Sequence, residues 1–161
     1  MPECVISSPI GPILIAHDEI GLTMVKWADA PLSPPSTPLL EEAVRQLRAW
    51  FDGTLTEFTL PLHMVGTPFQ LRCWEALQQI PYGETISYGE QARRIGNPKA
   101  SRAVGGANHR NRLCIVVPCH RVIGASGDLT GFGSGLHIKE WLLAHEQRVI
   151  HKASIKQAEN C

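Results

Sequence analysis

Helix-start and helix-stop signals in the second half of the chain restrict its fold more than any other feature of the sequence. The sequence TPFQ at residues 67–70 has the residues of a capping box, with proline at the first helical position, and it predicts a helix to about Gln79. The sequence SYGE at residues 87–90 is a second capping box, which predicts a short helix to Ile95. We therefore expect the C-terminal part of the chain to be mostly helical.

A Gly-Asn-Pro break at residues 96–98 follows the second of these helices, and residues 99 to about 107 can form a third helix. Two short helices around a glycine-containing break are typical of a helix-turn-helix. Apart from Arg102, the third helix has mainly small side chains, and its two glycines each weaken an isolated helix by roughly 1 kcal/mol. Close approach to another backbone, in either a nucleic-acid groove or a neighbouring helix, would explain these small residues.

The first third of the chain is predicted to be a small β-meander followed by one helix. Short apolar runs at residues 4–7, 12–16 and 22–27 are separated by turn-forming residues, which predicts three strands. Apolar residues in the segment 39–51 recur at three- and four-residue spacing and predict a helix that Gly53 ends. We divide the chain into an N-terminal α/β domain (1–66), a mainly helical C-terminal domain (67–148) and a flexible tail (149–161).

The composition is that of a folded globular protein. Hydrophobic residues make up 43% of the 161 residues and charged residues 19%, which excludes a wholly disordered chain. The longest apolar stretches have only a few residues, so we expect no membrane span. The N-terminus has no basic segment followed by an apolar one, and the five cysteines lack the spacing of a disulfide framework. These features predict a reducing compartment, cytosolic or nuclear.

The formal net charge of zero conceals a strongly basic segment. Residues 91–127 contain no aspartate or glutamate and seven basic residues: Arg93, Arg94, Lys99, Arg102, Arg110, Arg112 and Arg121. A segment of this kind is either the footprint of a polyanion or an ordinary solvated face, and charge alone does not choose between them. Because the segment covers the predicted helix-turn-helix, DNA binding is favoured.

Cys119 and His120 form the strongest candidate for chemistry in the sequence. They follow an apolar run at residues 115–117, which predicts a short buried strand. A thiol with a pKa of about 8.5 needs help to ionise near neutral pH, and an imidazole can take its proton directly or through one water. A carboxylate is the usual group that fixes the tautomer of such a base.

Less reactive interpretations of the same residues exist. Most cysteines are inert core residues, so the adjacency of Cys119 and His120 is weak evidence by itself. A metal site that includes Cys114 would lack a second convincing pair of ligands. A redox pair of Cys114 and Cys119 would lack the tight loop of a Cys-x-x-Cys motif.

Three segments together resemble the O6-alkylguanine-DNA alkyltransferases, also called methylated-DNA–protein-cysteine methyltransferases. The sequence PCHRVIG at 118–124 is preceded by RAVGGAN at 102–108 and followed by KEWLLAHE at 139–146. The match covers nearly all of residues 66–147 in the same order, and SSPIGP at 7–12 adds the N-terminal turn of the family. The resemblance implies a ribonuclease-H-like N-terminal domain, with a sheet and a helix, and a C-terminal domain with a winged-helix-like helix-turn-helix.

The resemblance also implies direct-reversal DNA repair. Members of the family bind double-stranded DNA through the minor groove, largely independently of sequence, and flip O6-alkylguanine, chiefly O6-methylguanine, into a pocket. A cysteine then takes the alkyl group irreversibly, so each molecule of this methyltransferase reacts once. The resemblance implies no cofactor, and the sequence has neither a dinucleotide-binding glycine motif nor a Walker loop.

Matching positions imply the roles of the reacting residues. Cys119 matches the acceptor thiolate, His120 matches its water-mediated base, and Glu146 matches the carboxylate that orients this base. Asn111 matches the asparagine that braces the turn between the recognition helix and the active-site strand. Tyr88 matches the tyrosine that rotates the 3′ phosphate and assists the departing guanine.

Other positions match DNA-binding and pocket residues. Arg102 matches the arginine that enters the base stack in place of the flipped guanine. The further DNA contacts that we expect are those of Ser87, Tyr88, Ala103, Gly105 and Arg110. The substrate pocket is expected to contain Asn108, Val122, Phe132, Gly133 and Ser134.

Several positions depart from the family pattern. Phe132 stands where many relatives have a tyrosine whose hydroxyl approaches O6, and Ser134 stands where glycine is common. Cys114 is close enough in sequence to the acceptor to line the pocket. Cys4 and His63 resemble parts of a structural zinc site of some relatives, but the sequence offers no full ligand set, so we expect no metal.

Two other functions compete with alkyl transfer. Alkyltransferase-like proteins bind such lesions and signal to other repair systems, but they lack the acceptor cysteine that is present here as Cys119. A helix-turn-helix transcription factor would read bases in the major groove, for which the small side chains around Arg102 offer few groups. We expect no membrane partner and a monomer in solution, with cooperative binding on DNA as an option. A prokaryotic protein of this kind would be cytoplasmic and nucleoid-associated, and a eukaryotic one nuclear.

Overall fold

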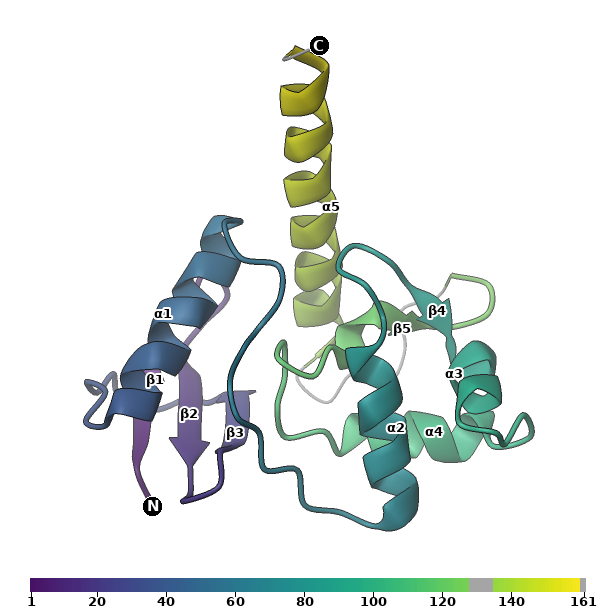
Figure 1. Ribbon diagram of the computed structural model, residues 1–161, viewed down its shortest axis with the longest axis horizontal. Coiled ribbons are helices and arrows are strands. Elements are labelled where there is room, and N and C mark those ends of the chain that lie inside the picture. The colour runs from purple at the N-terminus through teal and green to yellow at the C-terminus, as the bar shows by residue number, and fades with distance from the viewer. Residues whose placement is uncertain (128–134, 160–161) are drawn as a thin grey trace.

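The computed structural model describes residues 1–127 and 135–159, which form a small sheet domain beside a mainly helical domain (Figure 1). The sheet contains β1 (Glu3–Ile6), β2 (Ile13–His17) and β3 (Leu22–Trp27), which are antiparallel in the order β1-β2-β3. Helix α1 (Pro38–Asp52) packs on this sheet with its apolar stripe, as the three- and four-residue spacing predicted. The expected α/β class is therefore confirmed.

Both edges of the three-stranded sheet are covered by other segments of the chain. At the β1 edge, the N–H of Ser33 donates to the carbonyl of Val5 at 3.0 Å. At the β3 edge, the N–H of Leu22 donates to Pro61 at 2.9 Å, and the N–H of His63 donates to Leu22 at 2.8 Å. The backbone groups at these positions are thus paired within the chain.

The second domain consists of short helices and a two-stranded parallel sheet. Its elements are α2 (Pro68–Gln78), β4 (Ile86–Ser87), α3 (Tyr88–Arg94), α4 (Ser101–His109), the 3-10 helix η1 (Cys119–Arg121), β5 (Val122–Ile123) and α5 (Leu136–Glu159). Helices α2, α3 and α4 contact one another, and α3 and α4 flank the Gly-Asn-Pro break as a helix-turn-helix (Figure 1). No helix in the described part of the chain is long and apolar enough to cross a membrane.

Only one of the two predicted capping boxes forms completely. At α2, the Thr67 hydroxyl accepts from the N–H of Gln70, and the Gln70 side chain accepts from the N–H of Thr67. At α3, Ser87 caps the N–H of Glu90 at 3.0 Å, but the Glu90 carboxylate pairs with Arg93 and Arg94 instead. The second box is therefore only half present, because two arginines of the same helix compete for the glutamate.

The predicted buried strand at residues 115–117 is wrong, because this segment forms a turn. Before it, the N–H of Val25 donates to Arg112 at 2.8 Å and the N–H of Cys114 donates to Val25 at 2.9 Å, so the chain pairs with β3 only briefly. Ile115 then adopts φ 72°, a left-handed conformation that is strained for a β-branched residue. The chain reverses there, and the apolar side chains of the turn are buried without forming a strand.

Helix α5 extends into the segment that we expected to be a flexible tail. It continues to Glu159 without a glycine or proline to end it, and its C-terminal turns project beyond both domains (Figure 1). Residues 151–158 are all exposed, so packing does not hold them. Residues 149–159 are thus helical, and their mobility stays a prediction.

The two domains meet at Trp50, the last buried residue of α1. Its side chain is fully buried, and its ring centroid lies 4.8 Å from that of His145 and 6.3 Å from that of Tyr82. The ring nitrogen Nε2 of His145 donates to the Trp50 carbonyl at 2.9 Å. This contact places the N-terminal domain directly against α5.

Replacing the cap of α2 tests the contribution of the complete capping box. We expect Thr67→Ala to lower the free energy of unfolding by about 1 kcal/mol, because the N–H of Gln70 loses the hydroxyl oxygen that accepts its hydrogen bond. Chemical denaturation followed by circular dichroism measures this change. The exposed Thr56, which caps no helix, provides the control Thr56→Ala, and equal losses in both variants would contradict the role of the box.

Candidate functional site

Cys119 lies at the start of η1, directly after Pro118, and is 7% exposed. It lines a cavity of about 700 Å³ together with Cys114 and the loop that follows α4. Strand β3 supplies the opposite part of the lining through Met24, Lys26 and Trp27. The candidate nucleophile is therefore shielded from bulk water but reachable through a cavity.

Asn111 braces the turn that carries Cys119, as the family resemblance implied. Its side-chain amide donates to the carbonyl of Val117 at 2.8 Å and accepts from the N–H of Leu113 at 2.9 Å. One side chain thus joins the beginning and the end of the turn that contains the strained Ile115. The same amide also hydrogen-bonds to the thiol group of Cys119.

The surroundings of Cys119 favour its thiolate. A hydrogen bond from Cys114 is the largest influence and lowers the pKa of the Cys119 thiol, while burial opposes this effect. The hydrogen bond from Asn111 and the positive charge of Lys139 lower the pKa further. Cys114, which was expected only to line the pocket, is thus a direct hydrogen-bond partner of Cys119.

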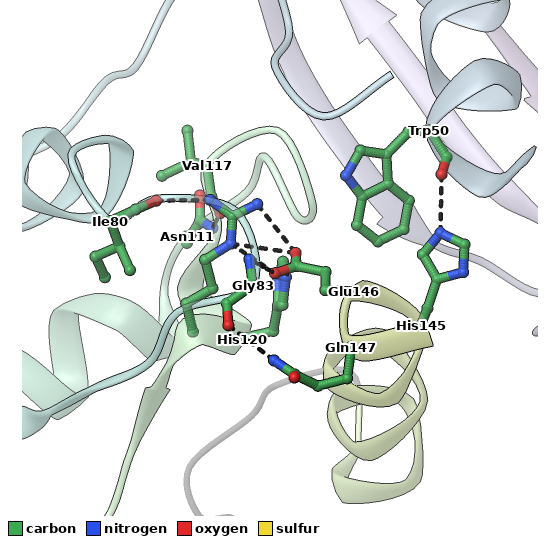
Figure 2. Close-up of polar contacts among 10 residues, drawn as sticks. Trp50, Ile80, Gly83, Asn111, Val117, His120, His145, Glu146 and Gln147 are labelled. Atoms are coloured by element: carbon green, nitrogen blue, oxygen red, sulfur yellow. Dashed lines mark hydrogen bonds and ion pairs between the residues drawn. The ribbon is translucent and has the colours of Figure 1, made fainter. Parts of the chain in front are cut away.

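His120 and Glu146 form a fully buried pair (Figure 2). The ring nitrogen Nε2 of His120 lies 2.6 Å from Oε2 of Glu146. Because a carboxylate only accepts, Nε2 carries the proton, and Nδ1 of the neutral ring is left as the acceptor. Within the described residues, Nδ1 is buried without a hydrogen-bond partner. This nitrogen is therefore available as a base.

The carboxylate of Glu146 is held from three directions (Figure 2). Besides His120, the guanidinium of Arg121 donates to both of its oxygens at 3.0–3.1 Å, and the N–H of Gly83 donates to Oε1 at 2.8 Å. Burial alone would raise the pKa of Glu146, but the hydrogen bonds and charges of His120 and Arg121 lower it to about 2. Glu146 is consequently ionised throughout the physiological range.

Gly83 is suited to this role by its backbone. Its φ of 81° is in the left-handed region, and a Cβ atom built there would lie 1.7 Å from the end of the Ile150 side chain. The Gly83 carbonyl also accepts from the side chain of Gln147 at 2.8 Å. The loop before β4 is thus attached to α5 through both the N–H and the carbonyl of Gly83.

Lys139 is a site residue that sequence analysis quoted in a motif without assigning it a role. It is 1% exposed, and its Nζ lies 3.5 Å from the Tyr88 hydroxyl and 5.7 Å from the centre of the Tyr88 ring. Burial lowers the pKa of Lys139, whereas a Cys119 thiolate raises it. The spacing along α5 could have indicated that Lys139 is buried. It lies three residues before Leu142 and seven before Glu146, so all three share the inward face of the helix.

The structure divides the basic segment into two groups. Arg121 is buried and paired with Glu146, so it offers no charge to a polyanion, whereas the exposed Arg93 and Arg94 share the single carboxylate of Glu90 and are only partly neutralised. The remaining four are exposed and make no ion pair within the described residues: Lys99, Arg102, Arg110 and Arg112. Our expectation that all seven basic residues attract phosphate is thus corrected for Arg121, which the site itself uses.

The expected DNA-binding residues lie on α4 and on the neighbouring β4 and α3. Arg102 and Ala103 are exposed, and Gly105 lies against the ring of Tyr88, which begins α3. Ser87 is half-buried and caps α3. The helix-turn-helix therefore brings Tyr88 between the exposed face of α4 and the buried Lys139, which is near enough to Cys119 to be influenced by its charge.

The expected pocket residues lie in different surroundings. Asn108 lines the cavity beside Cys119, but both ends of its amide pair with Gln91, at 2.7 Å and 3.0 Å. Val122 is buried in β5, which pairs with β4 at Ile86. Phe132, Gly133 and Ser134 lie outside the described residues.

The two residues that resemble parts of a zinc site do not meet. Cys4 belongs to the hydrophobic core of the N-terminal domain, whereas His63 pairs with Asp18 at the surface of the same domain. Throughout residues 1–127 and 135–159, no three histidine, cysteine, aspartate or glutamate side chains converge as metal ligands.

Removing the thiol of Cys114 tests its influence on the acceptor. We expect Cys114→Ala to raise the pKa of Cys119, so that Cys119 reacts more slowly with iodoacetamide at pH 7, by a factor of about three to ten. Cys114→Ser retains a donor and is expected to restore much of the reactivity. The rates are measured against pH by mapping the modified peptide, with Cys73→Ala as the control at a buried cysteine of α2. An unchanged pH midpoint in Cys114→Ala would refute the interaction.

Comparison with known proteins gives a consistent result for both domains. Residues 68–148 match the model of the 6-O-methylguanine DNA methyltransferase DNA-binding domain, and residues 2–64 match that of its ribonuclease-like domain. The chain is 55% identical over 153 residues to the methylated-DNA–protein-cysteine methyltransferase of Methanosarcina acetivorans, covering 91% of this chain and 98% of that protein. It is 50% identical to that of Mycobacterium leprae, over 89% and 90% of the two chains.

Solved structures agree with this result. The crystal structure of the Mycobacterium tuberculosis O6-methylguanine methyltransferase superposes with a TM-score of 0.83 at 48% identity, over 91% of this chain and 93% of that chain. The structure of Mycobacterium tuberculosis OGT in complex with DNA superposes with a TM-score of 0.84 at 49% identity, over 90% and 92% of the two chains. The chain therefore belongs to the methylated-DNA–protein-cysteine methyltransferases, the direct-reversal repair proteins that transfer the methyl group of O6-methylguanine in DNA to one of their own cysteines.

Proposed function

We propose that Cys119 is the acceptor and that the chain flips O6-alkylguanine out of duplex DNA to reach it. The observation that carries this proposal is the arrangement at η1. A buried thiol with a lowered pKa is followed directly by a histidine whose tautomer is fixed by a buried carboxylate. Cys4 and Cys73, by contrast, have raised pKa values because of burial and lie in the core.

The proton of Cys119 passes to Nδ1 of His120 through one water molecule, and the resulting thiolate attacks the alkyl carbon on O6. A carbon–sulfur bond forms, the bond between this carbon and O6 breaks, and the electron pair of the broken bond stays on guanine. Guanine gains one proton in exchange for the alkyl group, so the products are a thioether on Cys119 and unmodified guanine. Because a thioether sulfur is a poor leaving group, the reaction is irreversible and each molecule acts once.

The Tyr88 hydroxyl is the proposed source of a proton for the departing guanine. It lies beside the Lys139 ammonium, which is 3.5 Å away and is buried next to the acceptor. A positive charge in this position stabilises negative charge that develops on guanine and on the tyrosine oxygen. The same tyrosine begins α3, where it can also contact a phosphate.

The helix-turn-helix is proposed to enter the minor groove without reading the sequence. Its outward face presents Arg102 among small side chains such as Ala103 and Gly106, which allow close approach of a DNA backbone. Arg102 occupies the space of the flipped base, while exposed basic residues such as Lys99 and Arg110 attract phosphates. We further propose a monomer in solution that can bind DNA cooperatively, in the cytoplasm of a prokaryote or the nucleus of a eukaryote.

Mass spectrometry of the intact protein tests the acceptor. After mixing with a duplex that contains one O6-methylguanine, we expect a single gain equal to one CH₂ group, located in the peptide of Cys119. Cys119→Ala is expected to show no gain while still binding the lesion, and the control Cys73→Ala is expected to react normally. Lesion binding by the native protein without any mass change would instead assign it to the lesion-signalling class.

Comparing two substrates tests the role of Arg102. We expect Arg102→Ala to slow repair of duplex DNA by roughly 10- to 100-fold, because about 1.4 kcal/mol of lost flipping energy corresponds to a factor of ten. Reaction with the free base O6-benzylguanine, which needs no flipping, is expected to change less than twofold. Single-turnover rates measure both reactions, with Arg45→Ala as the control at an exposed arginine of α1. Equal slowing with both substrates would remove the flipping role.

A further inference from the structure

Arg121 is a buried cation that alkyl transfer as described above does not use. Its side chain is 8% exposed, and one guanidinium nitrogen donates to the carbonyl of Ile80 at 2.7 Å. The guanidinium carbon lies 5.4 Å from the centre of the Tyr82 ring, which covers it. The other two guanidinium nitrogens donate to Glu146, so each of the three nitrogens has a partner within the protein.

The carboxylate of Glu146 is therefore shared between a permanent cation and a titratable base. Its Oε2 accepts from His120 at 2.6 Å and from Arg121 at 3.0 Å. A buried carboxylate that faced His120 alone would stabilise the imidazolium, because the resulting ion pair would be neutral overall. An imidazolium has no free nitrogen and cannot take the proton of Cys119. With Arg121 present, the carboxylate is already neutralised, and a second cation in the same buried site has no counter-charge.

We propose that Arg121 is a positioning residue that keeps His120 neutral before the reaction, so that Nδ1 stays free to accept the proton of Cys119. This inference rests on the proposed function of His120 as the base. Glu146 then both orients the His120 ring and stabilises the imidazolium, and Arg121 weakens the second effect. Glu146 orients the ring through Nε2 in both protonation states. It stabilises the imidazolium after Cys119 has given up its proton, when the thiolate adds a negative charge to the site.

Of the other groups around His120 in the unreacted protein, Lys139 also disfavours the imidazolium, and the rest carry no charge. Lys139, on α5, adds a second positive charge, which also disfavours the imidazolium. Tyr82 is neutral, since burial raises its pKa to about 12, and Trp50 of α1 packs against the ring without charge. Cys119 favours the imidazolium only after it has become a thiolate. Burial lowers the pKa of His120 and the charge of Arg121 adds to this, while Glu146 opposes both.

The protonation state of His120 is read directly from the ring ¹⁵N shifts of the unreacted protein. We expect the native protein to show the neutral Nε2–H tautomer from pH 5.5 to pH 8. In Arg121→Gln and Arg121→Met, we expect the imidazolium to persist to a pH at least about one unit higher than in the native protein. Arg121→Lys retains a cation and is expected to keep His120 neutral. Arg45→Gln, at the surface of α1, serves as the control.

The pH dependence of methyl transfer gives an independent reading. In Arg121→Gln, we expect the rate to fall about tenfold for each pH unit below the new midpoint and to recover at higher pH. A purely structural role of Arg121 would lower the rate equally at all pH values and leave the ¹⁵N shifts unchanged, which would overturn the proposal. An imidazolium in the native protein at pH 7 would also overturn it, even if no Arg121 variant folds. Failure of the native protein to methylate Cys119 would refute the proposed function, whereas the ¹⁵N shifts would still report on Arg121.

Discussion

The buried carboxylate of Glu146 is the interaction on which the rest of the site depends. It collects hydrogen bonds from His120 and Arg121 of η1 and from Gly83 in the loop before β4, so one side chain of α5 joins three segments that are distant in sequence. A carboxylate without water is costly unless its oxygens are fully used. The hydrogen bonds that stabilise this buried carboxylate also fix the orientation of the His120 ring beside Cys119.

The N-terminal domain helps to fix the position of Cys119. The edge of β3 holds the chain on both sides of Leu113, just before the turn that Ile115 makes possible. On the other side, the carbonyl of Trp50 accepts from His145, the residue before Glu146. Both contacts act on residues adjacent to the chemistry. Cys119 and His120 are thus positioned by contacts from both domains.

Local signals in the sequence were sufficient for the three strands of the N-terminal sheet, for α1 and for the helix-turn-helix, because caps, glycines and apolar spacing act over a few residues. The predicted strand at 115–117 failed because three apolar residues do not reveal a turn whose conformation is imposed by Asn111 and by β3. Arg121 was also counted in the basic segment that predicted attraction to a polyanion. Its burial depends on Glu146, 25 residues away, and no periodic pattern reports such a pairing. The family resemblance, rather than spacing, identified Glu146.

The covered edges of the N-terminal sheet have a consequence for a protein that is consumed by its own reaction. Such a molecule waits for a single event, so its usefulness depends on how long it persists unreacted. An open strand edge can pair with a strand of a second chain, and the resulting aggregation would remove the molecule before it reacts. Here Ser33 closes the edge of β1, while segments from both domains close that of β3. The segments that cover the sheet therefore also occupy, at these positions, the backbone groups with which a second copy could pair.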